Sequence, residues 1–480
     1  MSSHTSNRGI VRTLIDNSFL LVAGAVAALI WANLDTESYN HYVNLDITSF
    51  WSDTEGHGTE DHSSGTTGHG EAHLAESGDA DHEGDHSDVD QTADAVVSTE
   101  TDHGDDHQHG DEHAESGEDH SEHAGHHGLT IHFIINDILM ALFFAIAAKE
   151  VWESLLPGGA LANPRKAATP LLATLGGILG PALVYLGGAY LTGTSADLGR
   201  GWAIPCATDI AFSYLIARII FGAGHPAIAF LLLLAIADDA AGLLILAIVY
   251  PQAPIVPTWL LLTVGSMGLA YVMRKSRVHS HWAYLLGPGA LCWWSFYQAN
   301  IHPALGLVPI IPMLPHAHTD LGLFAKAELE RNDTLNEFEH FWKTPVEFFL
   351  GLFGLANAGV VLSSLGAGTW LVLAGLLVGK PIGITAMTLL AEKGLKLQKP
   401  TGMDYRHVVT LGMVAGIGFT VALFVSVAAF TVPGPILDSV KMGALLSFGA
   451  APLAIIMGKA LRIQPLKVVA DESEEAAQAA

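Results

Sequence analysis

The sequence predicts an all-α polytopic membrane protein with about 12 transmembrane helices. Hydrophobic residues make up 50% of the chain, charged residues only 15%, and the mean hydropathy is +0.37. A helix needs about 20 mostly apolar residues to cross the hydrocarbon of a bilayer. Apolar stretches near that length recur at residues 10–33, 130–155, 168–193, 202–221, 226–250, 257–274, 281–300, 302–315, 345–364, 369–391, 405–430 and 439–460.

The first apolar stretch follows Arg8 and Arg12, as in a cleaved signal sequence. It is long enough to span a membrane, and no small-residue cleavage site follows "ALIWANLD". We therefore expect residues 1–33 to form a cytoplasmic N-terminus and the first transmembrane helix.

The basic residues predict the orientation of the chain. In an arrangement of twelve helices only Arg200 and Lys441 lie on one side, and Lys and Arg are enriched in cytoplasmic loops. Both termini are therefore predicted to be cytoplasmic. The residues on the predicted cytoplasmic side are Arg8, Arg12, Arg165, Lys166, Arg274, Lys275, Arg277, Lys326, Arg331, Lys343, Lys393, Lys396, Lys399, Arg406, Lys459, Arg462 and Lys467.

The formal net charge of −26 comes almost wholly from one segment. Residues 51–127 contain 23 Asp or Glu, 14 His and no Lys or Arg, so the rest of the chain has 25 acids against 22 bases. Such a segment cannot bury enough apolar surface to offset its ordering entropy. We expect a disordered periplasmic insert at 34–128, a transmembrane core at 129–465 and an acidic cytoplasmic tail at 466–480. The basic stripe that nucleic-acid binding requires is absent from the sequence.

Histidines in the insert alternate with carboxylates, and both groups bind transition metals. Fixed ligand spacing is missing, so loose binding is expected rather than one defined site. A solvated tether is the alternative. The weak candidate ligands are His103, His107, His109 and His113. Histidines elsewhere, such as His132, His225 and His302, are expected to be interfacial or packing residues.

Two apolar stretches contain residues that weaken a helix. "GWAIPCATDIAF" (201–212) places Pro205, Thr208 and Asp209 in the fourth span, and "LGMVAGIGFTVALF" (411–424) places three glycines in the eleventh. Freed backbone is tolerated at membrane depth where it lines protein or water. Both spans are therefore predicted to be discontinuous, with glycine-mediated close packing as the alternative.

Four charges lie deep inside predicted spans: Asp209, Asp238, Asp239 and Lys380. A charged side chain at this depth costs from about 2.5 kcal/mol upward, so such residues mark functional sites. Neighbouring helical residues point about 100° apart. We therefore expect one aspartate of the adjacent pair to bind a lysine and the other to face a cavity. The carboxylate oxygens of the pair can bind either a small cation or protons, and binding of one disfavours binding of the other. A structural ion pair is the alternative.

Enzymatic activity is not predicted, because no GxSxG, HExxH or P-loop motif occurs in its required context. Cys206 and Cys292 both lie in apolar runs, so a disulfide framework is not expected. No cofactor is predicted.

Six segments have the order and spacing found in one family. They resemble the NhaA-type sodium/proton antiporters of bacterial inner membranes, and the resemblance covers residues 8–460 apart from the insert. The segments are "NDILMALFF" (136–144), "GWAIPCATDIAFS" (201–213), "AIADDAAG" (235–242), "FGLANAGV" (353–360), "GKPIGI" (379–384) and "GIGFT" (416–420).

The resemblance implies inverted repeats in which spans four and eleven cross near the midplane, in a family that is itself an example of this architecture. It implies export of one Na⁺ or Li⁺ for two entering protons, an electrogenic exchange that serves sodium and pH homeostasis. Asp238 and Asp239 match the cation- and proton-binding pair. Thr208, Asp209 and Lys380 match the supporting residues at the helix break.

The resemblance also assigns a pH response to the cytoplasmic side, where the match is looser. The matching positions are Glu150, Glu153, Glu339 and His340. Lys149 directly precedes Glu150 and is expected to stabilise its negative charge, which leaves the strength of pH gating open. For Glu153 the alternative is a charge at the membrane boundary.

The same fold could exchange K⁺ or a transition metal for protons. In an alternative of another class, the membrane part is a passive anchor for a His-rich metal-binding module. The family region between the first two helices contributes to a homodimer contact, and here the insert replaces it, so the oligomeric state stays open.

Overall fold

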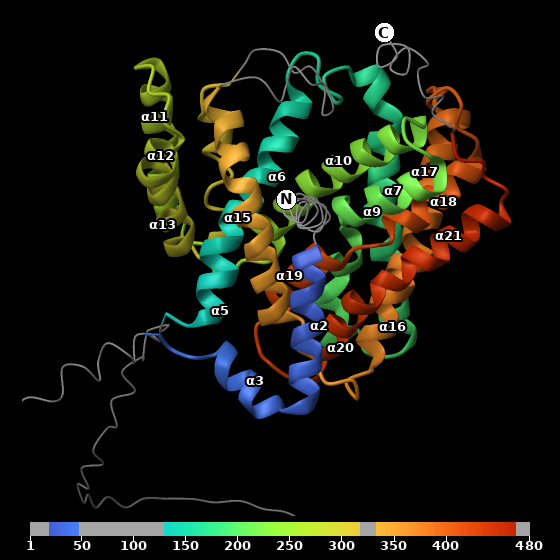
Figure 1. Cartoon of the computed structure of the whole chain (residues 1–480), viewed down its shortest axis with the longest axis horizontal. Coiled ribbons are helices and arrows are strands. Elements are labelled where there is room, and N and C mark those ends of the chain that lie inside the picture. The colour runs from blue at the N-terminus through green and yellow to red at the C-terminus, as the bar shows by residue number, and fades with distance from the viewer. Residues whose placement is uncertain (1–18, 48–128, 317–332, 467–480) are drawn as a thin grey trace, which may run out of the picture. The chain divides into compact units, whose positions relative to one another are not determined.

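The structure, a computed structural model, describes residues 19–47, 129–316 and 333–466. Every regular element in these ranges is a helix (Figure 1), which confirms the predicted all-α class. Predictions for the cytoplasmic start, for insert residues 48–128 with His103, His107, His109 and His113, and for the tail after residue 466 lie outside the described residues.

The helices follow one another with short connections. The α-helices are α2 (Phe19–Leu34), α3 (Thr36–Val43), α5 (Ile131–Phe133), α6 (Met140–Leu155), α7 (Pro164–Leu191), α8 (Ser195–Leu198), α9 (Ile210–Phe221), α10 (Pro226–Val249), α11 (Leu260–Lys275), α12 (His281–Tyr284), α13 (Ala290–Gln298), α15 (Thr334–Asn357), α16 (Ala367–Ala374), α17 (Lys380–Leu389), α18 (Tyr405–Ala415), α19 (Phe419–Ala429), α20 (Pro435–Leu446) and α21 (Ala450–Ala460). The 3₁₀ segments are η2 (Gly199–Cys206), η3 (Pro257–Trp259), η5 (Pro303–Leu305), η6 (Ile311–Met313) and η9 (Ser447–Gly449), and the π-helical segments are η1 (Ile134–Leu139), η4 (Leu285–Gly289), η7 (Gly375–Gly379) and η8 (Leu390–Gly394).

Several helical segments are suited to a membrane. Among the described residues, five are long and apolar enough to cross one: Ile131–Leu155, Ala167–Leu191, Pro226–Val249, Ala367–Gly394 and Pro435–Ala460. Two further segments are long and apolar enough only when two consecutive helices are taken together. They are Ser195–Cys206 with Ile210–Phe221, bent by 55°, and Tyr405–Ala415 with Phe419–Ala429, bent by 50°. The count rises to seven if each bent pair is one span. The total of twelve stays a prediction.

The eighth predicted span, 302–315, is not a continuous helix. The segment contains only η5 and η6, joined by turns. Pro303, Pro309, Pro312 and Pro315 explain the difference, since each lacks an N–H donor and interrupts helical hydrogen bonding. Apolar composition alone therefore gave the wrong secondary structure here.

The ninth predicted span begins earlier than its apolar run suggests. The run covers 345–364, whereas α15 covers Thr334–Asn357. The Asp333 carboxylate caps this helix by accepting a hydrogen bond of 2.9 Å from the Asn336 N–H, which satisfies one of the free donors of the first turn. A polar N-cap, rather than hydropathy, sets where α15 starts.

The predicted boundary of the insert at residue 34 is wrong, because α3 packs on the folded core. The Tyr39 hydroxyl donates to the Ala356 carbonyl at 2.9 Å and accepts from the Gly359 N–H at 3.2 Å. Further on, Asp46 and Thr130 form an isolated antiparallel bridge. Residues 35–47 therefore belong to the core, and the two flanks of residues 48–128 are hydrogen-bonded to each other.

Helices α7 and α17 approach at their backbones, because both are lined by glycine at the contact. A Cβ on Gly176 would overlap the carbonyl of Gly383, and a Cβ on Gly383 would overlap the carbonyl of Gly176. Gly180 and Gly379 repeat the arrangement one turn away. Small residues four positions apart allow this close approach in membrane helices. The contact sets the position of α17, which begins at Lys380.

Gly176→Ala is expected to destabilise the protein, because the added methyl group must separate two backbones that touch. Overpacking of this kind costs about 1–3 kcal/mol. Gly187→Ala, on the same helix but with open space around it, serves as the control. Thermal unfolding of the purified variants in detergent measures both. Equal unfolding temperatures for Gly176→Ala and the wild type would contradict the close approach.

Candidate functional site

Both bent helices are interrupted by non-helical backbone, and the interruptions touch. Residues 207–209 separate η2 from α9, and residues 416–418 separate α18 from α19. The Asp209 N–H donates to the Ile417 carbonyl at 2.8 Å, which joins one interruption to the other. These positions lie inside the two stretches in which breaks are predicted. One donor and one acceptor freed by the breaks thus satisfy each other within the protein, as hydrocarbon surroundings require.

Asp209 caps the second half of the first broken helix. Its Oδ1 accepts from the Phe212 N–H at 3.3 Å, and the Thr420 hydroxyl donates to its Oδ2. A helix N-terminus carries a partial positive charge, so a carboxylate is favoured there. The side chain is buried. Asp209 therefore offsets the end of α9, and Thr420 holds it from the other broken helix.

Lys380 lies at the opposite end of the same break. Its Nζ donates to the Cys206 carbonyl, the last of η2, at 2.6 Å and lies 3.3 Å from Asp238 Oδ2. The lysine is fully buried, with 0% of its surface exposed, and Asp238 is 3% exposed. A buried ammonium is stable only when it is paired and hydrogen-bonded, and both conditions hold here. Lys380 thereby joins α17 to α10 and to the broken helix.

The two oxygens of Asp238 have different surroundings. Oδ2 is bound by Lys380 and accepts a hydrogen bond of 2.8 Å from the Thr208 hydroxyl. Oδ1 is buried and has no hydrogen-bond partner among the described residues. One oxygen is therefore engaged, and the other is available as a ligand.

Asp239 faces away from this pair. It is half-buried, and it lines a small cavity between α6, α10 and α19. The other lining residues are Phe143, Phe144, Ala147, Gly242, Leu243, Leu246 and Val421. The prediction that one aspartate of the pair binds a lysine while the other faces a cavity is confirmed. The two carboxylates therefore have unequal environments, since Asp238 is held by the Lys380 ammonium and Asp239 faces a cavity.

The four residues predicted to respond to pH do not form one group. Lys149 Nζ pairs with Glu153 at 2.6 Å, one turn further along α6, and also with Glu339 on α15. Lys149 directly precedes Glu150 in the sequence, but its ammonium binds the carboxylates of Glu153 and Glu339. Glu150 is half-buried and His340 is exposed. Glu153 and Glu339 are thus brought together through Lys149, whereas His340 is separate from that contact.

Several polar residues near the site were missed at the level of sequence. Thr420 lies in the quoted segment "GIGFT" but was not assigned a role, although its hydroxyl reaches Asp209. Asn136 and Asn357 lie in two other quoted segments, and the Asn357 amide donates to Asn136 Oδ1 at 2.8 Å. The only indication in the sequence that these residues matter is that they lie in segments that resemble the family. Without the fold, nothing indicated that these distant segments meet.

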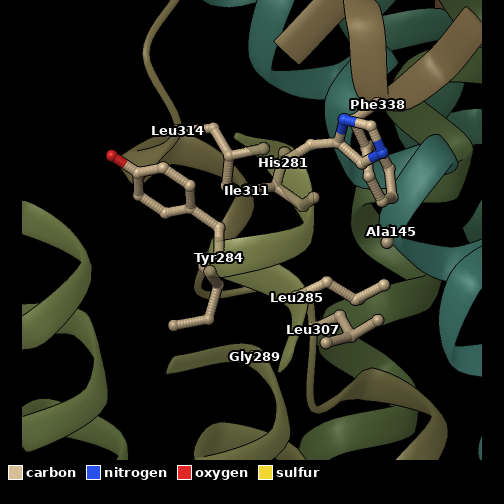
Figure 2. A pocket seen from close by; sticks show the side chains of 10 residues that line it. Ala145, His281, Tyr284, Leu285, Gly289, Leu307, Ile311, Leu314 and Phe338 are labelled. Atoms are coloured by element: carbon tan, nitrogen blue, oxygen red, sulfur yellow. The ribbon is translucent and has the colours of Figure 1, made fainter. Parts of the chain in front are cut away.

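A second cavity lies between α6, α12, α15 and the segment around η6, and it contains none of the predicted site residues (Figure 2). It is lined mainly by apolar side chains, among them Leu307, Ile311 and Phe338. The His281 ring also lines it, and neither ring nitrogen has a hydrogen-bond partner among the described residues. The nearest acidic oxygen is Glu337 Oε2, 3.6 Å from His281 Nδ1.

Within residues 19–47, 129–316 and 333–466, no group of three or more His, Cys, Asp or Glu side chains could hold a metal ion. The candidate histidines of the insert lie outside them.

Comparisons with known proteins agree on one family. A family sequence model described as Na⁺/H⁺ antiporter 1 matches residues 108–460. The Na⁺/H⁺ antiporter NhaA of Jannaschia sp. (strain CCS1) is 46% identical over 473 residues, covering 94% of this chain and 97% of its own. The NhaA of Geobacter sulfurreducens is 51% identical over 339 residues (70% and 88%), and that of Desulfitobacterium hafniense (strain DSM 10664 / DCB-2) is 50% identical over 351 residues (72% and 89%).

The family match spans the helices that carry the aspartate pair, both interruptions and the buried lysine, and it covers well over half of the chain. Relatives at about half identity align with most of the chain, in agreement with the resemblance of the six segments. The chain therefore belongs to the NhaA family of Na⁺/H⁺ antiporters.

Proposed function

We propose that this chain exports Na⁺ or Li⁺ in exchange for protons, with Asp238 and Asp239 as the shared binding site. The observation that carries the proposal is the difference between the environments of Asp238 and Asp239. Asp238 is bound to Lys380 and Thr208, whereas Asp239 lines a cavity. Oxygen ligands suit small hard cations. The relatives' names supply Na⁺ and H⁺ as the exchanged ions, and Li⁺ is implied by the resemblance to the family.

Asp239 is proposed as the main cation ligand, and Asp238 as its exchangeable partner. A cation entering the cavity meets the Asp239 carboxylate first. The unbonded Oδ1 of Asp238 supplies a second oxygen. Positive charge at this point competes with Lys380 for Asp238, because one carboxylate cannot fully compensate both cations. Competition for the same oxygens couples cation binding to proton release.

The proposed stoichiometry of two protons for one cation is the one that the resemblance to the family implies. Two carboxylates hold two protons in one state and a single monovalent cation in the other. Two protons then enter for each Na⁺ that leaves, so one net charge crosses the membrane per cycle. The exchange is therefore proposed to be electrogenic and driven by the proton-motive force.

Thr208, Asp209 and Thr420 are proposed to hold the broken helices in place. Thr208 orients Asp238, and Thr420 orients Asp209 from the other broken helix. Asp209 offsets the positive end of α9, while Lys380 offsets the carbonyl end of η2. Balanced helix ends keep the cavity from carrying excess charge before the cation arrives.

We further propose that the chain lies in a bacterial inner membrane with both termini in the cytoplasm. The asymmetry of Lys and Arg between the two sides supports this orientation. Glu150, Glu153, Glu339 and His340 are then cytoplasmic and are retained as the proposed pH-responsive residues. A homodimer and loose metal binding by the insert also remain proposals.

Asp239→Asn is expected to reduce Na⁺-driven proton movement by at least about tenfold, equivalent to ~1.4 kcal/mol or more of lost cation binding. The amide keeps the size of the side chain but removes its charge. The measurement is dissipation of a preformed proton gradient in everted membrane vesicles after addition of Na⁺ or Li⁺. K⁺ and Zn²⁺ are tested in turn.

A second readout is proton release when Li⁺ is added to the purified, weakly buffered protein. Wild-type protein should release protons and Asp239→Asn should not. Unchanged exchange in Asp239→Asn contradicts the proposed site, and a gradient dissipated only by K⁺ or Zn²⁺ contradicts the sodium assignment.

Thr420→Val is expected to weaken exchange more than Thr410→Val. Both threonines are buried on the same broken helix, but only the Thr420 hydroxyl binds Asp209, whereas the Thr410 hydroxyl has no partner among the described residues. Loss of a hydrogen bond to a charged group costs about 1.5–3 kcal/mol. Apparent Na⁺ affinity in vesicles measures the difference. Equal affinities in the two variants would exclude the positioning role of Thr420.

Deletion of residues 52–127 is expected to leave Na⁺-dependent exchange within about twofold of the wild type, since a factor of two is only ~0.4 kcal/mol. The flanks are already joined, with the Ile47 N–H donating to the Leu129 carbonyl at 3.0 Å, so a short glycine linker can close the chain. Vesicle assays of both proteins at matched expression provide the test. Loss of exchange on deletion would favour the alternative in which the membrane part is a passive anchor and the His-rich insert carries the function.

A further inference from the structure

One oxygen of the Asp238 carboxylate has no bound group. Asp238 is only 3% exposed, and its Oδ2 is bound by Lys380 and Thr208. Its Oδ1 is buried and has no hydrogen-bond partner among the described residues. A buried carboxylate oxygen without a partner is costly and rare in folded proteins. Oδ1 is therefore suited to a species that brings positive charge or a hydrogen-bond donor to it.

Helix α7 passes this oxygen at Gly177. A Cβ on Gly177 would lie 3.7 Å from Asp238 Oδ1, and 3.4 Å and 3.6 Å from Cγ1 and Cδ1 of Ile384 on α17. These are the nearest atoms that other helices present to this position. Helix α7 contacts both α10, which carries Asp238, and α17 (Figure 1). The missing side chain of Gly177 thus leaves a space about the size of a methyl group, bounded by the free oxygen and by Ile384.

The packing of α7 does not explain why residue 177 is a glycine. At the neighbouring Gly176, a Cβ would overlap the carbonyl of Gly383 on α17. Residue 177 points about 100° away from that contact, and a Cβ there would meet its neighbours at ordinary van der Waals distances. Helix α7 is regular through this position, where alanine is the better helix former. The fold therefore accounts for Gly176 but leaves Gly177 to be explained by the space beside Asp238.

We propose that the space beside Gly177 gives the exchanged cation room at Asp238 Oδ1, which makes Gly177 a specificity-determining residue for Na⁺ against Li⁺. Selectivity between cations of equal charge depends on cavity size and on the number and flexibility of the ligands. Na⁺ is the larger of the two ions, so loss of this space disfavours Na⁺ more than Li⁺. The inference rests on the proposed function and deepens it, because it assigns part of the choice of ion to a helix that supplies no ligand side chain.

The first variant is Gly177→Ala, which fills the space with one methyl group. Its unfolding temperature in detergent is expected to be at or above that of the wild type, in contrast to Gly176→Ala. In everted vesicles its apparent affinity for Na⁺ is expected to fall by about tenfold or more and that for Li⁺ by less, so that the ratio of Na⁺ to Li⁺ affinity falls by about threefold or more. Gly187→Ala, on the same helix but with open space around it, is the matched control and should keep the wild-type ratio.

The second variant is Ile384→Val, which enlarges the same space from α17. It removes Cδ1, the atom 3.6 Å from the position of the added Cβ. The ratio of Na⁺ to Li⁺ affinity is expected to rise by about twofold or more, opposite to its change in Gly177→Ala. A general loosening of the helix packing would not shift the ratio in opposite directions in the two variants.

Proton release from the purified, weakly buffered proteins on addition of Na⁺ or Li⁺ gives the same ratio without transport. The proposal is overturned if Gly177→Ala keeps the wild-type ratio, as it would if the space held only water, or if Ile384→Val fails to shift the ratio in the opposite direction. An unfolding temperature of Gly177→Ala as low as that of Gly176→Ala would overturn it as well, because the fold itself would then require the glycine.

These outcomes differ from a failure of the proposed function. In each of them the wild type and Gly187→Ala still exchange Na⁺ for protons. Absence of Na⁺-driven and Li⁺-driven exchange in the wild type and in every variant would instead contradict the proposed function, and the inference with it.

Discussion

The buried ammonium of Lys380 is the interaction on which the rest of the site depends. With no exposed surface, it is held by the Cys206 carbonyl at 2.6 Å and by Asp238 at 3.3 Å. Removal of the Asp238 carboxylate would leave an unpaired charge in a medium that cannot solvate it, at a cost of about 3–5 kcal/mol. The lysine therefore dictates that α10, α17 and the end of η2 stay together. The glycine contact between α7 and α17 places it there, because α17 begins at Lys380.

Lys380 also explains why the neighbouring aspartates differ. The ammonium compensates the Asp238 carboxylate. Because neighbouring residues of a helix point in different directions, Asp239 faces the cavity instead. The other side chains that line this cavity are apolar. Asp209, which caps α9 and is bound by Thr420, is similarly occupied. Of the three deep aspartates, Asp239 is the one for which no fixed partner exists among the described residues. The absence of a fixed partner is the reason that Asp239 is proposed as the main cation ligand.

The sequence was sufficient for features that depend on local chemistry and insufficient for those that depend on distant contacts. An adjacent Asp pair in an apolar run predicted unequal partners from helix geometry alone. Prolines in 302–315 were visible but outweighed by hydropathy, which gave a helix where turns occur. Lys149 directly precedes Glu150 in the sequence, yet its ammonium binds Glu153 and, on α15, Glu339. The contacts of Thr420 and Tyr39 were not predictable, because each depends on a segment far along the chain.

The same geometry places a continuous helix beside two broken ones at the ion site. Helix α10 runs without interruption through the aspartate pair. Helices α9 and α18 instead adjoin non-helical residues, 207–209 before α9 and 416–418 after α18, and the two interruptions are joined by the Asp209 N–H and the Ile417 carbonyl. Asp238 is therefore positioned by an unbroken helix, and Lys380 by the glycine contact between α7 and α17. The separation of these two charges depends on the packing of continuous helices, whereas Asp209 is positioned by the helix end that it caps and by Thr420.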